Sequence, residues 1–345
     1  MIPIQNVYYM LSYAFQVLNE QGYKNIATEQ FHNTAELMAA ILEKGIAIQL
    51  KRGLGKEYIP QTEALSSLRG KIDIAESIKT QSMLRKQLIC TYDEFSVNSI
   101  MNRIIKSTVE LLLRSNISKQ RKKNLRKLMV YFSEVDFIDL YTVNWNVQYN
   151  RNNQTYRMLI SICYLVVKGL LQTQSNGHTK LMDFLDEQRM CRLYEKFILE
   201  YYRKEFKNQF TANASQIPWQ LDNEENSMLP VMQSDIMLQS GEKVLIIDAK
   251  YYEHSTQVQF DKHTLHSGNL YQIFTYVKNK EYELREKDHT VSGMLLYAKT
   301  DEEIYPNNVY QMSGNQITVR TLDLNLPFDE IAGQLNTIAK THFDL

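Results

Sequence analysis

The stretch Gln233-Ser-Asp-Ile-Met-Leu-Gln-Ser-Gly-Glu-Lys-Val-Leu-Ile-Ile-Asp-Ala-Lys-Tyr-Tyr252 decides the fold of the second half of the chain. Residues 244–247 form an apolar run typical of a buried strand. The tight turn at Ser240-Gly241 predicts that the preceding segment folds back as a neighbouring strand. Because side chains alternate along a strand, Asp248 and Lys250 are expected on the same side of it.

A second acid, Asp235, lies on the first of these two strands, and the hairpin brings it within reach of Asp248. Two carboxylates so close repel each other unless a cation lies between them. A hard divalent ion such as Mg²⁺, with Mn²⁺ as a substitute, takes such oxygen ligands. The ammonium of Lys250 can then orient or help deprotonate a metal-bound water, while the ion offsets the charge that grows on a phosphate. This pattern predicts phosphodiester hydrolysis, whereas a bare Asp-x-Lys would indicate only an exposed ion pair.

Three further side chains flank this site. Glu195 lies in a predicted helix, where its carboxylate could reach the metal or, alternatively, face solvent beside a neighbouring cation. Gln272 and Tyr276 are four residues apart in another predicted helix, so one face offers an amide and a phenol to the cleft or to DNA. For Tyr276, core packing is the alternative. The nearby histidines lack a cysteine partner and an H-E-x-x-H arrangement, so we interpret them as loop residues: His254, His263 and His266.

The elements around the hairpin predict an α/β fold. Their order is helix, strand, strand, helix and strand, which requires helices on a mixed central sheet. A last strand and a closing helix complete the domain. The predicted ranges are 187–206, 228–238, 243–250, 266–278, 291–297, 316–322 and 328–339.

The first half of the chain predicts helices around a small β-rich segment that projects from them. Strand-like pieces occupy residues 46–51, 57–60 and 67–74, with a turn at Arg52-Gly53-Leu54-Gly55. A polar, glycine-containing linker at residues 173–179 separates an N-terminal domain, 1–175, from a C-terminal domain, 180–345. The helical ranges are 4–18, 34–46, 96–114, 118–132 and 156–171.

The charges balance over the whole chain, with 39 Lys and Arg against 39 Asp and Glu, so there is no global attraction for a polyanion. Any contact with nucleic acid has to come from a local patch or from a partner. Residues 119–127 hold six cations and no acid. This run is either a solvated helical face or a contact for a DNA backbone or an acidic partner.

Composition excludes several classes of protein. The three cysteines are widely separated and lack C-x-x-C spacing, which argues against a disulfide framework or a zinc finger. No apolar run approaches the roughly 20 residues of a membrane helix, and the N-terminus has neither a basic leader nor a cleavage site. We therefore expect a cytoplasmic protein without a membrane partner. No G-x-x-x-x-G-K-[ST] occurs, so any nucleotide would be hydrolysed by another chain.

Nearly the whole chain resembles the McrC family, the nuclease subunits of McrBC systems, which restrict DNA that carries 5-methylcytosine. In the second half, the matching segments are Ser234-Asp235, Ile246-Ile-Asp-Ala-Lys-Tyr-Tyr252 and Asn269-Leu-Tyr-Gln272. In the first half, they are Asn6-Val-Tyr-Tyr-Met-Leu-Ser-Tyr-Ala14, Lys51-Arg-Gly-Leu54, Tyr58, Leu68-Arg-Gly-Lys-Ile-Asp73 and Asn102-Arg-Ile-Ile-Lys106.

The resemblance implies that the C-terminal domain has the restriction-endonuclease-like PD-(D/E)xK fold. Asp235, Asp248 and Lys250 would be its catalytic triplet. Ser234 stands where the usual proline precedes the first acid, a departure that these nucleases commonly tolerate. The Gln272-x-x-x-Tyr276 pair is similar to the Q-x-x-x-Y element of RecB-like nucleases.

The resemblance further implies an obligate partner, an AAA+ GTPase of the McrB type. That partner would bind GTP and read methylated or hydroxymethylated cytosine, preceded by a purine, in double-stranded DNA. The N-terminal domain would insert into the GTPase ring and stimulate it, and cleavage would follow translocation between two sites. The candidate insertion element is residues 46–74, with Lys51, Arg52 and Lys56 as candidate stimulating residues. Arg52 could equally be a plain surface arginine.

We therefore expect a type IV restriction endonuclease subunit. Two other functions stay open. An autonomous repair or recombination nuclease would cut DNA without GTP or a partner. A regulatory subunit of an NTPase ring would have lost nuclease activity, but the intact Asp235, Asp248 and Lys250 count against that function.

Overall fold

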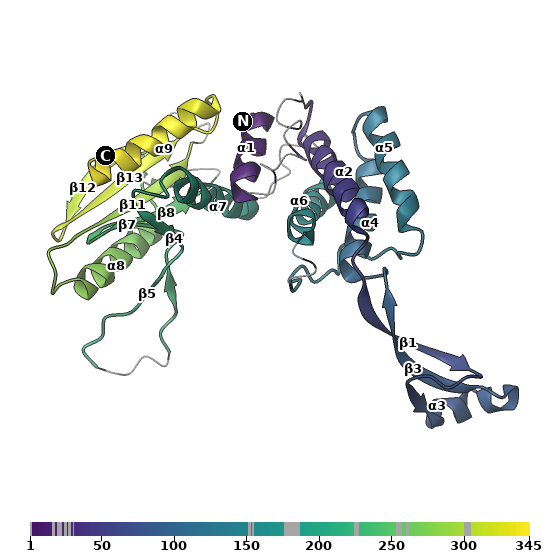
Figure 1. Ribbon diagram of the computed structural model, residues 1–345. Coiled ribbons are helices and arrows are strands. Elements are labelled where there is room, and N and C mark those ends of the chain that lie inside the picture. Colours follow the sequence, from purple (N-terminus) through teal and green to yellow (C-terminus); the bar gives the residue numbers. More distant parts are fainter. Residues whose placement is uncertain are drawn as a thin grey trace. The chain divides into compact units, whose positions relative to one another are not determined.

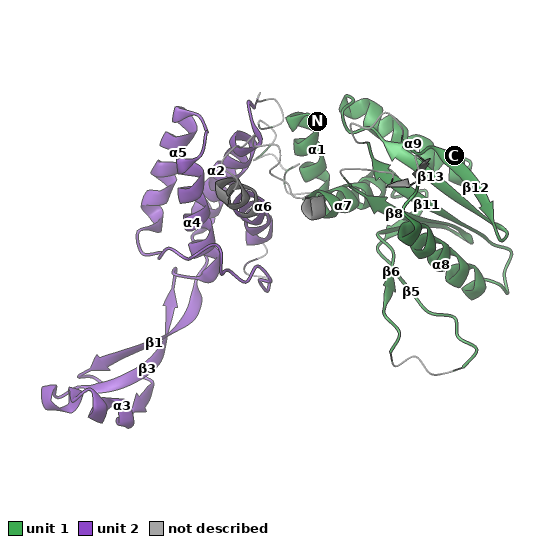
Figure 2. Ribbon diagram, turned by 180° about the vertical axis from the view of Figure 1, so that it is seen from behind, with its two compact units in different colours: residues 1–29, 185–345 green, residues 30–184 purple. Residues whose placement is uncertain are grey.

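A computed structural model describes most of the chain (Figure 1). It describes residues 2–15, 31–150, 155–175, 187–223, 228–252, 257–259, 262–299 and 305–345, and positions 18, 23, 26, 29 and 153. The chain divides into two compact units (Figure 2). Unit 1 consists of Met1–Glu29 and Leu185–Leu345, and unit 2 consists of Gln30–Phe184.

A six-stranded mixed sheet forms the centre of unit 1 (Figure 1), with the strand order β12-β13-β11-β8-β7-β4. The three strands β8, β11 and β13 run parallel to one another, and β7 and β12 pair antiparallel with their neighbours. This sheet confirms the expected mixed α/β architecture. The bounds are β4 Thr211–Asn213, β7 Ile236–Ser240, β8 Lys243–Lys250, β11 Thr290–Ala298, β12 Asn308–Met312 and β13 Asn315–Leu322.

Helices cover both faces of this sheet. On one face, α8 (Ser267–Glu283) packs Ile273 and Val277 into a core with Val244 and Ile246 of β8. The other face carries α7 (Glu187–Glu205), whose Tyr202 hydroxyl donates to the carbonyl of Leu335 in α9 (Phe328–Phe343). Because β8 is covered on both sides, its apolar run is continuous rather than alternating.

Two short strands lead into the sheet from the region that the sequence predicted as one strand. β5 (Gln216–Ile217) pairs with β6 (Met232–Gln233), separately from the main sheet. The expected strand over residues 228–238 is therefore two strands, with a break at Ser234. The backbone N–H of Ser234 donates instead to the carbonyl of Ser215. The separate pair β9 (Gln257–Gln259) and β10 (Lys262–Thr264) follows β8.

The first helix, α1 (Ile4–Ala14), belongs to unit 1, although residues 1–175 were expected to form one domain. The ring of Tyr9 stacks on Phe328 with centroids 4.4 Å apart, and Tyr13 packs against Phe197 at 5.7 Å. The side-chain amide of Asn6 donates to the carbonyls of Leu324 and Leu326, both at 2.8 Å. These partners lie about 200 to 300 residues away, so helical periodicity alone could not reveal them.

Unit 2 contains a group of helices, in which Ile46 continues the buried face of α2. The strand expected at residues 46–51 is wrong, because α2 extends to Arg52 and ends at Gly53, whose φ is +90°. A short apolar run fits a buried helix as well as a strand. The bounds are α2 Thr34–Arg52, α4 Ile100–Arg114, α5 Lys119–Met129 and α6 Tyr156–Ser175, with a 3-10 turn at Val130–Phe132.

A three-stranded antiparallel sheet projects from these helices (Figure 1). β1 (Glu57–Leu65) pairs along its whole length with β3 (Leu88–Ser96), and β2 (Lys71–Asp73) pairs with the other edge of β3. α3 (Ile74–Lys79) and a 3-10 turn at Ser82–Arg85 follow β2. The expected projecting β-rich segment is present, although β3 was not predicted.

The base of the projecting sheet is tied to the helices by buried hydrogen bonds. The side-chain amide of Asn102 donates to the carbonyls of Gly55 and Val97, at 2.9 Å and 2.8 Å, beside β1 and β3 respectively. The Tyr156 hydroxyl donates to the side-chain oxygen of Asn102 and accepts from the backbone N–H of Gly55, both at 2.7 Å. Two helices therefore hold both long strands at their point of attachment.

The expected linker lies only partly within the described residues. Positions 173–175 continue α6, and residues 176–179 lie outside the described ranges. The compact units divide nearby, after Phe184. Among the described helices, none is long and apolar enough to cross a membrane.

Candidate active site

Asp248 and Lys250 form an ion pair at the end of the central strand β8. Lys250 Nζ lies 2.8 Å from Asp248 Oδ2, and the two side chains are 14% and 1% exposed. Both side chains point to the face of the sheet that α8 covers, as alternation along the strand predicts. The predicted juxtaposition of a carboxylate and an ammonium is therefore present.

Asp235 lies immediately before β7, beside the same end of β8. The β7–β8 register pairs Ile236 with Ile247, so one further step brings Asp235 opposite Asp248. Its Oδ2 accepts a hydrogen bond of 3.0 Å from the backbone N–H of Ala249. The hairpin thus holds two carboxylates next to each other, as the sequence predicted.

Burial makes Asp248 the most strongly perturbed of these acids. Burial, opposed by Lys250 and assisted by Asp235, raises the pKa of its carboxyl to about 7. Neither oxygen of Asp248 accepts a well-oriented hydrogen bond from any described residue. A buried carboxylate without such bonds is costly, and a cation would offset that cost.

Lys250 is held as a cation. Burial alone would lower its pKa, but the adjacent Asp248 carboxylate raises the pKa above the ordinary value of a lysine. The same ammonium donates to Gln272 Oε1 at 3.3 Å. The ammonium therefore lies between the Asp248 carboxylate, its ion-pair partner, and the Gln272 side-chain oxygen, its hydrogen-bond acceptor.

The two residues predicted on one face of α8 do meet the site. Gln272 Nε2 donates to the Tyr276 hydroxyl at 3.0 Å, while Gln272 Oε1 receives Lys250. Tyr276 is also part of the apolar core between α8 and the sheet. Tyr276 therefore packs in the core and also bonds to Gln272, which in turn bonds to Lys250.

Glu195 approaches from α7 on the other face of the sheet. Its Oε1 accepts a hydrogen bond from the Cys191 thiol at 3.0 Å. Burial raises the pKa of Glu195, and the charge of Asp235 raises it further. Glu195 is partly buried, and the charges of Lys250 and Arg192 oppose the rise of its pKa.

A second series of hydrogen-bonded side chains beside the site was not predicted from the sequence. Asn269 Nδ2 donates to the Tyr297 hydroxyl at 2.9 Å, and the Tyr252 hydroxyl donates to Asn269 Oδ1 at 3.3 Å. Tyr297 pairs with Lys250 in the β8–β11 register, and burial raises the pKa of Tyr297 to about 12. Asn269 lies three positions before Gln272 on α8, a spacing that could have indicated one shared face.

The donors at this site suit a hard cation. Asp235, Asp248 and Glu195 offer carboxylate oxygens, which Mg²⁺ and Mn²⁺ prefer over nitrogen or sulfur. Within the described ranges, no three acidic, histidine or cysteine side chains already converge closely enough to enclose an ion. Asp235 and Asp248 are the two adjacent carboxylates of the site, and the charge of Asp235 acts on Glu195.

The histidines near the site divide between described and undescribed residues. His266 packs edge-on against the ring of Tyr252, with centroids 5.3 Å apart. It lies in the short loop between β10 and α8, as expected of a loop residue. His254 and the side chain of His263 lie outside the described residues.

The candidate stimulating residues lie in unit 2, at the junction of helix and projecting sheet. Lys51 and Arg52 occupy the exposed last turn of α2. Lys56 lies just before β1, with its ammonium 5.8 Å from the centre of the Phe95 ring. It also lines a cavity of about 330 Å³ together with Tyr156.

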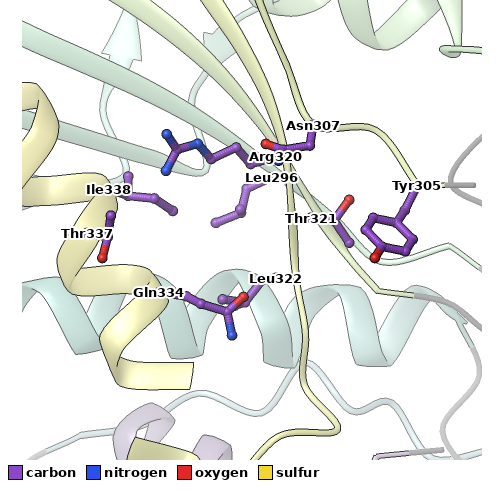
Figure 3. Close-up of a pocket in the computed structure, with 9 residues that line it drawn as sticks. All are labelled: Leu296, Tyr305, Asn307, Arg320, Thr321, Leu322, Gln334, Thr337 and Ile338. Atoms are coloured by element: carbon purple, nitrogen blue, oxygen red, sulfur yellow. The ribbon is translucent and has the colours of Figure 1, made fainter. Parts of the chain in front are cut away.

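A separate cavity of about 360 Å³ lies in unit 1 between the sheet and α9 (Figure 3). Arg320 of β13 and Gln334 of α9 project into it, with Leu296 in the wall. Leu296 pairs with Ala249 in the sheet register, so this cavity opens on the face opposite Asp248. It contains none of the candidate catalytic residues.

Fold and site together define a mixed α/β protein with a buried acid–lysine centre at the end of its central strand. The chain belongs to the family described as "McrBC 5-methylcytosine restriction system component", whose profile matches residues 5–298. This membership confirms the resemblance to McrBC components that the sequence motifs indicated.

The chain is also similar to individual proteins, among them a curated relative and two solved structures. The chain is 29% identical over 329 residues to "Type IV methyl-directed restriction enzyme EcoKMcrBC" of Escherichia coli K12, covering 94% of this chain and 93% of the relative. A half-complex of Thermococcus gammatolerans McrB AAA+ hexamers with bound McrC has a TM-score of 0.49 at 17% identity, covering 97% of this chain and 76% of the other. The Thermococcus gammatolerans McrBC complex has a TM-score of 0.42 at 21% identity, covering 59% of each chain.

Proposed function

We propose that this McrBC component is the DNA-cutting subunit, a metal-dependent endonuclease of the PD-(D/E)xK class. The observation that carries the proposal is the buried Asp248 carboxylate, which lacks well-oriented hydrogen bonds and lies beside Lys250 and Asp235. Lys250 neutralises only one of the two adjacent carboxylates, Asp235 and Asp248, and a further cation would offset the repulsion that remains between them. The arrangement supports phosphodiester hydrolysis assisted by Mg²⁺, with Mn²⁺ as a substitute.

The residues of the chain have distinct roles in this reaction. Asp235 and Asp248 would hold the ion, with Glu195 as a further carboxylate on the α7 side. The bound ion would act as a Lewis acid that offsets phosphate charge and lowers the pKa of water. Lys250, from its place between Asp248 and Gln272, would present an N–H to a phosphate oxygen or to the attacking water. Gln272 and Tyr276 position this lysine.

The proposed substrate is double-stranded DNA that carries modified cytosine. The family description names 5-methylcytosine, and the Escherichia coli relative is named as methyl-directed. None of the described site residues offers an obvious pocket for one base, so we assign recognition to a partner chain. We place the complex in the cytoplasm.

The proposed partner is an AAA+ GTPase of the McrB type, which would bind GTP. The projecting sheet of unit 2 supports a protein contact, because it exposes large apolar side chains that a free surface rarely groups together. Lys51, Arg52 and Lys56, near the base of this sheet, are the candidates that stimulate GTP hydrolysis. The exposed apolar residues of the sheet and its following turns are Tyr58, Leu68, Ile72, Ile74, Ile78, Met83, Leu84 and Phe95.

A cleavage assay tests the proposal. Methylated and unmethylated plasmid would be incubated with Mg²⁺ and the purified chain, with and without the partner GTPase and GTP. Asp248→Asn removes the charge and keeps the size of the side chain. Asp323→Asn is the matched control, because Asp323 also forms an ion pair with a lysine on the same sheet, 2.6 Å from Lys299.

We expect cutting of methylated plasmid only with both GTPase and GTP, lost in Asp248→Asn and retained in Asp323→Asn. Cutting by the chain alone would instead establish an autonomous nuclease. A chain that stimulates the GTPase but never cuts DNA, with or without Asp248, would be a regulatory subunit and would overturn the metal site.

A further inference from the structure

Helix α5 in unit 2 holds more cations than the described residues around it pair with acids. It contains no acidic residue. Arg121 is paired, at 2.8 Å from Glu43 and 3.4 Å from Glu36. The other five cations form no ion pair with any described residue, and we call them the α5 stripe: Lys119, Lys122, Lys123, Arg126 and Lys127.

The paired and unpaired residues occupy opposite sides of the helix. At about 100° per residue, the α5 stripe spans an arc of roughly 140°. Arg121, Asn124 and Leu125 lie on the remaining side, where Leu125 is fully buried and Asn124 donates to Glu43. The rest of unit 2 therefore packs against one side of α5, and the α5 stripe lies on the side that faces solvent.

The cations of the α5 stripe destabilise the helix that carries them. Lys119 and Lys123, Lys122 and Arg126, and Lys123 and Lys127 are like charges four residues apart, which destabilise a helix. Lys119 and Lys122 also lie in the first turn, where the helix dipole favours anions. The two acids nearest to α5 that contact it, Glu36 and Glu43, are already bonded to Arg121. A bound anion would reduce the repulsion among the cations of the α5 stripe.

The charge density matches that of a DNA duplex. The stripe extends over eight residue steps, about 12 Å at 1.5 Å per residue. Duplex DNA carries one charge per about 1.7 Å of axis, hence about seven phosphates in that length. We propose that the α5 stripe binds the backbone of duplex DNA without sequence preference, as a contact separate from the candidate active site.

The choice of DNA over an acidic protein follows from composition. Along the helix, no large apolar side chain is exposed between Lys119 and Met129, whereas protein interfaces need a desolvated apolar centre; the exposed Val130 and Tyr131 follow only after its end. The inference rests on the proposed action of the chain on DNA, but it concerns binding and not cutting. It can therefore fail or hold independently of the metal site.

Fluorescence anisotropy with a labelled, unmodified 30-base-pair duplex tests this inference, in EDTA so that no cleavage occurs. The variant replaces the five residues of the α5 stripe with glutamine, which is a comparable helix former. A matched control replaces five exposed cations of unit 2 elsewhere: Lys44, Lys71, Lys79, Arg85 and Lys86. A third variant exchanges lysine and arginine within the stripe and keeps every charge.

We expect the neutral variant to bind the duplex at least roughly ten-fold more weakly near 100 mM salt. The slope of log affinity against log salt should fall by about 4, since each released phosphate contact contributes about 0.9. The control and the charge-preserving variant should keep the wild-type slope, and circular dichroism should show an unchanged fold. An unchanged slope in the neutral variant would overturn the inference. So would intact DNA binding combined with lost binding to the GTPase, which would identify an acidic protein partner.

Discussion

Lys250 Nζ lies 2.8 Å from Asp248 Oδ2 and also donates to Gln272, while the carboxylate of Asp235 acts on Asp248 as a like charge. The lysine remains charged because the carboxylate raises its pKa, while burial raises the pKa of the carboxyl. Together with Asp235, two carboxylates face the single ammonium of Lys250, so the site has an excess of negative charge that a bound cation would balance. Its properties lead to predictions about metal binding, pH, positioning and the contact with the partner.

Mg²⁺ is expected to stabilise unit 1 through Asp248. Free ion at ten times its dissociation constant adds about 1.4 kcal/mol, or roughly 3–6 °C in melting temperature for a unit of this size. Asp248→Asn should abolish the shift, because it removes one carboxylate donor. Differential scanning calorimetry with and without MgCl₂ measures it, and Asp323→Asn should behave like the wild type. An equal shift in Asp248→Asn would exclude Asp248 as a ligand.

Without metal, the contribution of Asp248 to folding stability should fall as the pH rises from about 4 to 7. The folded pKa of Asp248, about 7, lies above the unfolded value of about 3.9, so the native state binds more protons in this window. The difference corresponds to at most about 4 kcal/mol. Urea unfolding in EDTA across this range measures the effect. In Asp248→Asn the fall should be smaller; an identical pH dependence in both proteins would show that Asp248 titrates normally.

Gln272 is expected to act by positioning Lys250. Gln272→Ala should lower the turnover of the complex by roughly 10–100-fold, as for other residues that orient a metal site, with little change in the KM for DNA. Tyr276→Phe removes only the distal hydroxyl and should cost less than Gln272→Ala. Steady-state cleavage kinetics separate kcat from KM. A rise in KM with normal kcat would assign Gln272 to DNA binding instead.

The Tyr156 hydroxyl is expected to matter for the partner contact and not for the active site. Tyr156→Phe removes the hydroxyl that accepts from the N–H of Gly55 and donates to the side-chain oxygen of Asn102, which costs about 1–3 kcal/mol. The base of the projecting sheet should loosen, so stimulation of the GTPase should weaken while Mg²⁺ still shifts the melting temperature. Tyr131→Phe, at an exposed position, is the control. Normal GTPase stimulation by a destabilised Tyr156→Phe protein would argue against this role.

Short-range sequence patterns predicted the elements whose apolar or polar side chains clearly follow one secondary-structure period. Residues 244–247 are apolar enough to specify a buried strand, and the i, i+4 spacing of Gln272 and Tyr276 correctly placed both on the site. The prediction failed where a short apolar run fits a helix and a strand equally well. Residues 46–51 continue α2 because Ile46 faces the core of unit 2, and β3 escaped notice because much of it is exposed.

The sequence by itself determined the chemistry of this protein: a carboxylate and an ammonium two residues apart on a strand, with a second acid one hairpin away. Strand alternation and the turn at Ser240-Gly241 are local rules and require no knowledge of distant residues. Only the tertiary structure decided that Asp248 is buried without well-oriented hydrogen bonds, that Asn269 reaches Tyr297, and that α1 packs in unit 1. Each of these depends on segments far apart in the chain, and burial is a property of the packed elements rather than of any one of them.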